Sequence, residues 1–265
     1  MSTVFAHSVD GLEITRVESD TRLWTGHATH YGICLAVGGA FDFWYRKRIA
    51  THAVGRLKLK EPGEVHRDVR VHEPVTAVSI ALSQAWAERA SLACGMTSVP
   101  HFSAPVTRGG GRAERKAARL YDAITAVHPD RFEWESLLVE TMGILWSDYG
   151  EVRARAPEAP SSSGETARRV REYLHEHMRE GVNLDALATA AGRSKFHMMR
   201  LFRAEYGLAP YEYLTHLRVA RARLSLAAGV PAAKVAVDVG LYDQSQLHRH
   251  FKRITGMTPA AYARG

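Results

Sequence analysis

The 265-residue sequence has only two cysteines, Cys34 and Cys94, and neither belongs to a Cys-x-x-Cys or Cys/His motif. A disulfide framework or a structural zinc site is therefore not expected. The sequence also lacks any stretch approaching the roughly 20 apolar residues that a membrane-spanning helix needs. Its N-terminus has no apolar run after a basic start, which a secretory signal would require. These absences predict a cytoplasmic protein with no membrane partner.

Positive charge is concentrated in the C-terminal part of the chain. The formal net charge is +7, yet residues 1–150 carry 17 basic and 17 acidic side chains. Residues 166–265 carry 16 basic and 8 acidic side chains. A neutral region followed by a basic one indicates that the second region binds a polyanion. A basic face that meets only solvent is the alternative interpretation.

The length of the chain suggests two domains. The segment 151–165 contains two prolines, three consecutive serines and a glycine, without apolar periodicity. Such a composition is typical of a linker. We therefore expect one domain over residues 1–150 and a second over residues 166–265.

The first domain combines β-structure with helices. Between Tyr31 and Ser83, short β-rich runs alternate with Gly-Gly and Pro-Gly turns. Two segments with helical periodicity follow, Arg112–Val127 and Phe132–Tyr149, and the sequence His128-Pro129-Asp130 separates them. This pattern predicts a small β-sheet or barrel followed by a helical hairpin.

The second domain is predicted to be all-helical, with about seven helices, so the expected fold class is α+β. Its helices begin and end with recognisable capping chemistry. Asn183 and Ser194 suit N-caps, Pro210, Pro231 and Pro259 suit first turns, and glycines 181, 192, 207, 229, 240 and 256 suit helix ends.

An internal repeat runs through this second domain. The offset between the copies is 48 residues at first and 49 afterwards, so the second copy has one extra residue, which we expect in a turn. The matching pairs are Ala188/Ala236, Gly192/Gly240, Arg200/Arg249, Phe202/Phe251, Arg203/Lys252, Gly207/Gly256, Pro210/Pro259 and Tyr213/Tyr262. Each copy predicts a helix-turn-helix unit, although protein-binding helical arrays also contain repeats.

Helical periodicity gives the second helix of each unit an outward, polar face. In the first unit this face contains Lys195, Phe196, Met199, Arg200 and Arg203, and in the second it contains Gln244, Ser245, His248, Arg249 and Lys252. Arg and Gln read guanine and adenine edges in the major groove. Ser, Lys and the more distal Arg suit phosphates. The two faces are therefore candidate DNA-contacting surfaces.

A long helix is predicted between the two units, over Tyr211–Ala228. Its expected apolar stripe contains Leu214, Leu217, Ala220 or Arg221, and Leu224. About 18 residues at 1.5 Å each span roughly 27 Å. Such a spacer can place two recognition helices in successive major grooves, about 34 Å apart.

Residues Glu165–Arg264 resemble the DNA-binding domain of the AraC family of transcription regulators. The signature of its second unit is matched by Gly240, Phe251, Lys252, Gly256, Pro259 and Tyr262. Leu241 and Leu247 stand where the family usually has aromatic residues, so we expect altered packing there without loss of function.

The resemblance implies base contacts from both units. They would come from Phe196, Met199 and Arg200 in the first unit and from Gln244, Ser245, Gln246, His248 and Arg249 in the second. Because Met199 offers no strong hydrogen bond, the first unit is expected to read sequence less stringently.

The first domain is similar to a cupin barrel, which AraC-family members often use to bind effectors and to dimerise. The similarity is carried by Gly55–His66, a Gly…Pro-Gly-x-x-His pattern. Candidate effector-binding residues are Trp24, His27, Phe41, Phe43, Tyr45 and His66. Strand alternation places Phe41, Phe43 and Tyr45 on one face, and ordinary core packing is the alternative for these aromatics.

The resemblance implies a sequence-specific regulator, an activator, that responds to a small-molecule effector. Its expected partners are promoter DNA, RNA polymerase and a second copy of the chain. The predicted helical hairpin is a candidate dimerisation surface, although Trp134, Met142 and Trp146 also suit burial within one protomer. No cofactor, metal or catalytic residue is expected.

Two enzyme classes remain as alternatives. A metal-dependent cupin fused to a DNA-binding module would use His27, His30 and His66, but no glutamate follows the HxxH pattern at a useful distance. A DNA-repair sensor with a methyl-accepting cysteine would need a metal–thiolate cluster, which neither cysteine offers.

Overall fold

The computed structural model describes residues 3–151 and 162–264. Most of the predicted linker, residues 152–161, lies outside the described residues. At its edges, Glu151 belongs to a short strand and residues 162–165 form the first turn of a helix.

An antiparallel sheet of seven strands forms the centre of the molecule. The strands are β1 (Thr3–Val9), β2 (Leu12–Asp20), β3 (Thr25–His27), β4 (Tyr31–Tyr45), β5 (Arg48–Ala53), β6 (Leu57–Lys60) and β7 (Val65–Leu82). Strands β1 to β3 precede the region in which the sequence predicted β-structure. The pairing order is β1-β2-β7-β4-β5, with β3 on β7 and β6 on β4. The expected α+β class, with a β-domain first and helices after it, is confirmed, and so is the strand-turn-strand over Gly55–His66; among the described residues no pairing joins β5 to β1.

The two longest strands bend sharply, which curves the sheet. Register shifts interrupt the β4–β7 pairing between Ala36 and Phe41. Gly39 lies at this bend with φ of 76°, and a Cβ there would lie 2.2 Å from the carbonyl oxygen of Pro74. Only glycine fits such a close approach of two backbones.

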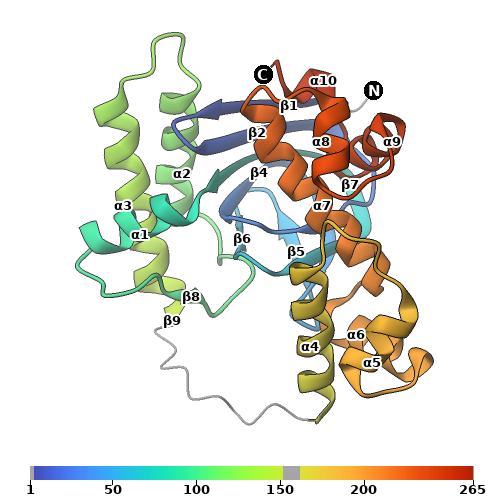
Figure 1. Ribbon diagram of the computed structural model, residues 1–265. Coiled ribbons are helices and arrows are strands. Elements are labelled where there is room, and N and C mark those ends of the chain that lie inside the picture. Colours follow the sequence, from blue (N-terminus) through green and yellow to red (C-terminus); the bar gives the residue numbers. More distant parts are fainter. Residues whose placement is uncertain (1–2, 152–161, 265) are drawn as a thin grey trace.

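Three helices, α1 (Gln84–Ala93), α2 (Arg112–Ile124) and α3 (Arg131–Tyr149), pack on one face of the sheet (Figure 1). The short strands β8 (His101–Phe102) and β9 (Gly150–Glu151) pair beside them. The predicted hairpin is therefore confirmed. Trp134, Met142 and Trp146 are all buried within this core, so they are not part of an exposed dimerisation surface.

The second domain has seven helices among its described residues, as expected. They are α4 (Ser162–Glu176), α5 (Leu184–Ala191), α6 (Lys195–Tyr206), α7 (Pro210–Ala227), α8 (Ala232–Asp238), α9 (Gln244–Thr255) and α10 (Pro259–Tyr262). Helices α5 and α6 form one helix-turn-helix unit, and α8 and α9 form the other. Each unit has its own hydrophobic core, to which Phe202 and Phe251 respectively contribute.

The extra residue of the second copy lies in its turn. Both recognition helices begin with a side-chain N-cap: Ser194 accepts from the backbone N–H of His197, and Asp243 from that of Gln246. Three positions separate Gly192 from the start of α6, whereas four separate Gly240 from the start of α9. The helix faces of the two copies therefore correspond despite the insertion.

Helix α7 is shared by both units. Leu214 and Leu217 belong to the first core, whereas Val219, Ala222 and Leu226 belong to the second. The predicted apolar stripe is partly wrong, because Leu224 is 51% exposed. One stripe does not describe this helix, since it is covered on several sides by the two units and by the sheet.

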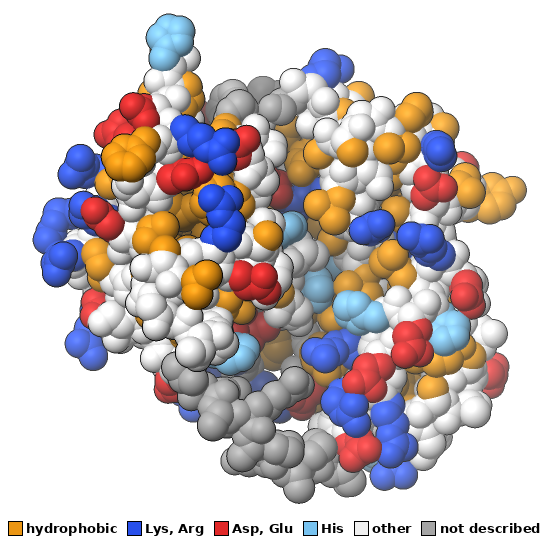
Figure 2. Space-filling view, turned by 60° about the vertical axis from the view of Figure 1, so that its left-hand side comes forward, with side chains coloured by type: hydrophobic (Ala, Val, Ile, Leu, Met, Phe, Trp, Pro, Cys, Tyr) orange, Lys and Arg blue, Asp and Glu red, His pale blue; other side chains and the backbone are white. Residues whose placement is uncertain are grey.

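The C-terminal helices lie against the side of the sheet opposite α1–α3 (Figure 1). In the space-filling view, a furrow separates the lobe built on α2 and α3 from the lobe of C-terminal helices (Figure 2). No helix within residues 3–151 and 162–264 is long and apolar enough to cross a membrane.

Candidate functional site

Helix α6 presents most of its predicted DNA-contacting residues to solvent. Lys195, Phe196, Arg200 and Arg203 are exposed, with Phe196 at 75%, while Met199 is half-buried against the core. The Lys195 ammonium pairs with Asp185 at 2.6 Å, on the preceding helix of the same unit. The structure therefore gathers the five side chains on one helix, with Met199 the least accessible.

Helix α9 presents a similar surface. Gln244, Ser245, His248, Arg249 and Lys252 are exposed. Gln246 is half-buried, and its side-chain oxygen accepts a hydrogen bond at 2.8 Å from the backbone N–H of Tyr242. Gln246 thus helps to cap the helix through its side-chain oxygen. Tyr242, which the sequence analysis missed, is 90% exposed in the preceding turn.

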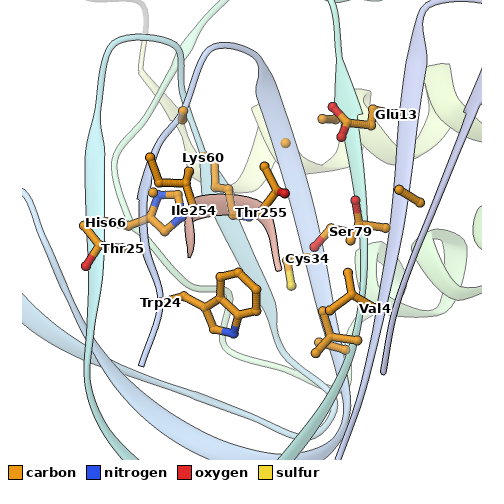
Figure 3. Close-up of a pocket in the computed structure, with 18 of the residues that line it drawn as sticks. Val4, Glu13, Trp24, Thr25, Cys34, Lys60, His66, Ser79, Ile254 and Thr255 are labelled. Carbon is orange, nitrogen blue, oxygen red and sulfur yellow. The ribbon is translucent and has the colours of Figure 1, made fainter. Parts of the chain in front are cut away.

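A pocket of about 280 Å³ lies between the sheet and the C-terminal helices. Strand residues form one side, and residues of α7 and of the end of α9 form the other. Figure 3 shows Ile254 and Thr255 of α9 beside the strand residues His66 and Lys60. Four of the six predicted effector-binding residues line it: Trp24, His27, Phe41 and His66. Phe43 and Tyr45 share the face of Phe41, as predicted, but do not line the pocket and belong to a buried cluster.

The charges that line the pocket are mostly paired. Three basic side chains each face a carboxylate: Arg22 faces Asp20 at 2.9 Å, Lys58 faces Asp68 at 3.7 Å, and Arg223 contacts Glu13. Lys60 also lines the pocket and forms no ion pair with any described residue. The pocket therefore carries one uncompensated positive charge.

The buried Lys58–Asp68 pair is held against aromatic rings. The Lys58 ammonium lies 4.0 Å from the ring centre of Phe43 and 5.0 Å from that of Phe41. Burial lowers the pKa of Lys58 to about 8 and raises the pKa of Asp68. Burial thus disfavours the charged form of both side chains. The pair therefore adds little positive potential to the pocket.

Several polar atoms that line the pocket have no hydrogen-bond partner in the described structure. They include Nδ1 of His27, Nδ1 of His66 and Nε of Arg223. Burial lowers the pKa of His27 to about 3 and that of His66 well below its ordinary value, so both imidazoles are neutral near pH 7. Buried polar atoms are normally satisfied, and a bound polar molecule would satisfy these.

The residues present do not fit a metal ion. Within the described part of the chain, no three His, Cys, Asp or Glu side chains lie close enough together to hold one. His27 instead approaches the Tyr213 hydroxyl, and His30 pairs with the Thr29 hydroxyl. Cys34 is buried beside the pocket, and the Cys94 thiol donates to the Val139 carbonyl oxygen.

Sequence reasoning found only four of the residues that line this pocket and missed most of the others. It did not find Lys58, Lys60, Asp68 or Arg223, nor His216 and Ile254 from the second domain. The alternating pattern Lys58-Leu59-Lys60 within a β-run is the one local signal that points to the lysines, since two charges on one side of a buried strand need a polar environment. No local pattern indicates that α7 and α9 close the pocket.

Comparison with known proteins agrees with this architecture. A family model described as a helix-turn-helix domain matches residues 187–265. YbfI of Bacillus subtilis, described as an uncharacterized HTH-type transcriptional regulator, is 33% identical over 113 residues, which cover 43% of this chain and 40% of YbfI. The chain thus spans less than half the length of this relative. The regulatory protein SoxS of Salmonella typhimurium is 30% identical over 92 residues, covering 34% of this chain and 86% of SoxS.

The whole fold is shared with a solved structure. ToxT of Vibrio cholerae superimposes with a TM-score of 0.58 over 97% of this chain and 98% of ToxT, at 8% identity. One ToxT structure is described as bound to an unsaturated fatty acid. The repeated helix-turn-helix units, the match to nearly the whole of SoxS and the shared two-part fold lead to one conclusion: this chain belongs to the AraC family of transcription regulators.

Proposed function

We propose that this protein is a sequence-specific DNA-binding regulator whose DNA binding responds to a small anionic effector with an apolar body. The observation that carries the proposal is the pocket, which is bounded on one side by the sheet and on the other by α7 and α9. An effector between these elements contacts the DNA-binding region directly, so its binding energy can depend on how that region is placed.

Both recognition helices are equipped to bind DNA. Arg200 in α6 and Arg249 in α9 are exposed at matching positions of the repeat, and an arginine there can donate two hydrogen bonds to guanine. Helix α7 has 18 residues, about 27 Å at 1.5 Å each. This length suits two units that enter successive major grooves on one side of the duplex. The second unit carries more hydrogen-bonding side chains and therefore reads sequence more stringently.

The effector class follows from the pocket chemistry. Lys60 supplies a positive charge without an internal partner, and His27 and His66 supply neutral ring nitrogens without hydrogen bonds. Trp24, Phe41 and Ile254 supply apolar surface. A carboxylate attached to an apolar body satisfies both features. The fatty acid held by ToxT, whose fold is shared, supports this class.

Other parts of the proposal concern assembly. We infer that residues 1–150 form the effector-binding and dimerisation domain and residues 166–265 the DNA-binding domain, and that the protein acts as a homodimeric activator with RNA polymerase and not as an enzyme. Val127 and Phe132, at the tip of the α2–α3 hairpin, are 91% and 83% exposed and supply apolar surface for a second copy.

Genome-wide capture of DNA fragments by the full-length chain tests the proposal. We expect enrichment of fragments that share two half-sites about one helical turn apart. The doubly substituted R200A/R249A chain should lose this enrichment while keeping its thermal unfolding temperature. Fragments without a common sequence would overturn sequence-specific recognition. Stoichiometric iron, zinc or nickel in the purified protein would instead favour the metal-dependent enzyme.

A further inference from the structure

The two recognition helices end on equivalent glycines of the repeat. Gly207 ends α6 with φ of 75°, and Gly256 ends α9 with φ of 77°. In each case the glycine N–H donates to the carbonyl oxygen four residues earlier, that of Arg203 or Lys252. Left-handed glycines are common at helix ends, so this geometry alone has a purely local explanation.

A second feature of these glycines has no such local explanation. A Cβ on Gly207 would lie 2.5 Å from Cζ3 of Trp44, and a Cβ on Gly256 would lie 2.4 Å from Cη2 of Trp24. Gly229 has the same backbone conformation, with φ of 77°, but has no atom within 4 Å of the corresponding position. The indole contacts are therefore a separate property of the two recognition helices.

Both tryptophans come from the first domain. Trp44 lies near the end of β4, and Trp24 lies directly before β3. A salt bridge of 2.8 Å between Lys47 and Glu205 accompanies the first contact. The side chain of Val4, on β1, accompanies the second, 3.3 Å from a Cβ on Gly256. The glycine that ends each recognition helix therefore contacts a different indole of the first domain. Trp44 contacts Gly207, and Trp24 contacts Gly256.

The two contacts differ in their relation to the pocket. Trp24 lines it, together with Ile254 and Thr255 from the last turn of α9 (Figure 3). The Trp24 indole N–H donates to Asp20 at 2.7 Å, and its backbone N–H donates to Asp68 at 3.1 Å. Trp44 does not line the pocket. A molecule that fills the pocket therefore meets Trp24 and leaves Trp44 untouched.

We infer that Trp44 and Trp24 are positioning residues for DNA recognition, each setting the place of one recognition helix relative to the sheet. Trp44 anchors the first unit whether the pocket is filled or empty. Trp24 transmits effector binding to the second unit through Gly256. This inference rests on the proposed effector response. It adds that the effect of the bound molecule passes from Trp24 to Gly256, so that the second unit moves relative to the first.

Fluorine NMR on the full-length chain tests the contacts directly. The five tryptophans are labelled with 5-fluorotryptophan, and Trp24→Phe and Trp44→Phe assign two of the resonances. We expect Gly256→Ala to shift the Trp24 resonance alone and Gly207→Ala to shift the Trp44 resonance alone. Gly229→Ala, which introduces the same backbone strain away from any indole, should shift neither. Unchanged resonances at Trp86, Trp134 and Trp146 report that each variant is folded.

Sodium oleate then serves as the probe for the pocket. We expect it to shift the Trp24 resonance and not that of Trp44. In the Gly256→Ala chain, its effect on affinity for a captured DNA fragment should fall to less than about a third of that in the wild-type and Gly229→Ala chains.

Three results would overturn the inference: Gly256→Ala leaving Trp24 unshifted, Gly229→Ala shifting both tryptophans, or oleate moving Trp24 and Trp44 equally. A fourth result separates the two proposals. If oleate shifts no tryptophan, the proposed effector class fails, and the glycine variants still decide whether the indoles position the helices.

Discussion

The Tyr213 hydroxyl on α7 lies 3.1 Å from Nε2 of His27 on β3, which joins the two domains by a buried polar contact. The same hydroxyl lies 3.2 Å from Nε2 of His175 on α4. A hydroxyl can donate to one imidazole and accept from the other, so this one tyrosine of α7 connects the sheet with α4. Tyr213 itself is fully buried.

Removal of this hydroxyl should weaken the contact between the domains. Tyr213→Phe keeps the ring packing but leaves two imidazole nitrogens without their partner, at a cost of about 1 to 3 kcal/mol. We expect a lower thermal unfolding temperature. Tyr206→Phe is the matched control, because the Tyr206 hydroxyl has no hydrogen bond to the described part of the chain and its ring packs on Tyr213. Equal destabilisation by both changes would contradict the role of the shared hydroxyl.

Acid should destabilise the protein through its interdomain histidines. Burial lowers the pKa of His27 to about 3 and of His216 to about 4, from an ordinary value of 6.5. The folded state therefore favours the neutral imidazoles. Their contribution to the free energy of unfolding is fully present above pH 6.5 and is lost as the pH falls toward 4. Each histidine contributes at most about 1.4 kcal/mol per pH unit. Thermal unfolding at pH 7.5, 6 and 5 measures the loss.

The histidine assignment has its own check. His216→Gln should flatten the dependence of stability on pH between 6.5 and 4. His128→Gln, in the loop between α2 and α3, should leave the slope as it is. A His216→Gln chain with the wild-type slope would show that other groups cause the acid sensitivity.

The salt dependence of DNA affinity distinguishes the two roles expected on α9, which are base reading by Arg249 and phosphate binding by Lys252. Arg249→Ala should lower affinity for a captured fragment by about 1 to 3 kcal/mol and leave affinity for random DNA nearly unchanged. Lys252→Ala should weaken binding to both and reduce the slope of log affinity against log salt by about 1. Fluorescence anisotropy titrations between 50 and about 200 mM salt measure both. An equal loss on random DNA for Arg249→Ala excludes base reading.

Lys60 should determine preference for anionic effectors. Lys60→Gln removes the unpaired charge and retains a hydrogen-bonding side chain, so we expect oleate affinity to fall about tenfold, or 1.4 kcal/mol. Affinity for oleyl alcohol, which lacks the carboxylate, should change little. Lys234→Gln, at an exposed position of α8, controls for net charge. If oleate and oleyl alcohol lose affinity equally, Lys60 contributes packing and not charge recognition.

The C-terminal fold was predictable because its determinants are local. Ser194 caps α6, Pro210 opens α7, and Gly207 and Gly256 end helices, each within a few residues of the structure it specifies. The repeat supplied an internal check on each assignment. The exposed face of α9 followed from periodicity, whereas the cap formed by Gln246 depends on the backbone of Tyr242 and was not visible in the pattern.

Most of the pocket was not predictable because its residues meet through long-range contacts. Alternation placed Phe41, Phe43 and Tyr45 on one face correctly. Which of them reaches the pocket depends on the bend of β4 near Gly39, and only Phe41 does. Arg223 is 210 residues from its partner Glu13, and a pattern read over a dozen residues cannot connect them.

Helix α7 also fixes the rotational phase of DNA recognition. Both hydrophobic cores are built on its 18 residues, so the two units cannot turn about it independently. Each residue of a helix adds about 1.5 Å and turns the chain by about 100°. One inserted residue in α7 would scarcely change the distance between the units but would carry the second unit more than a quarter of a turn around the helix axis. The length of this helix therefore selects which face of the duplex the second unit meets, and hence the spacing of half-sites that one chain can read.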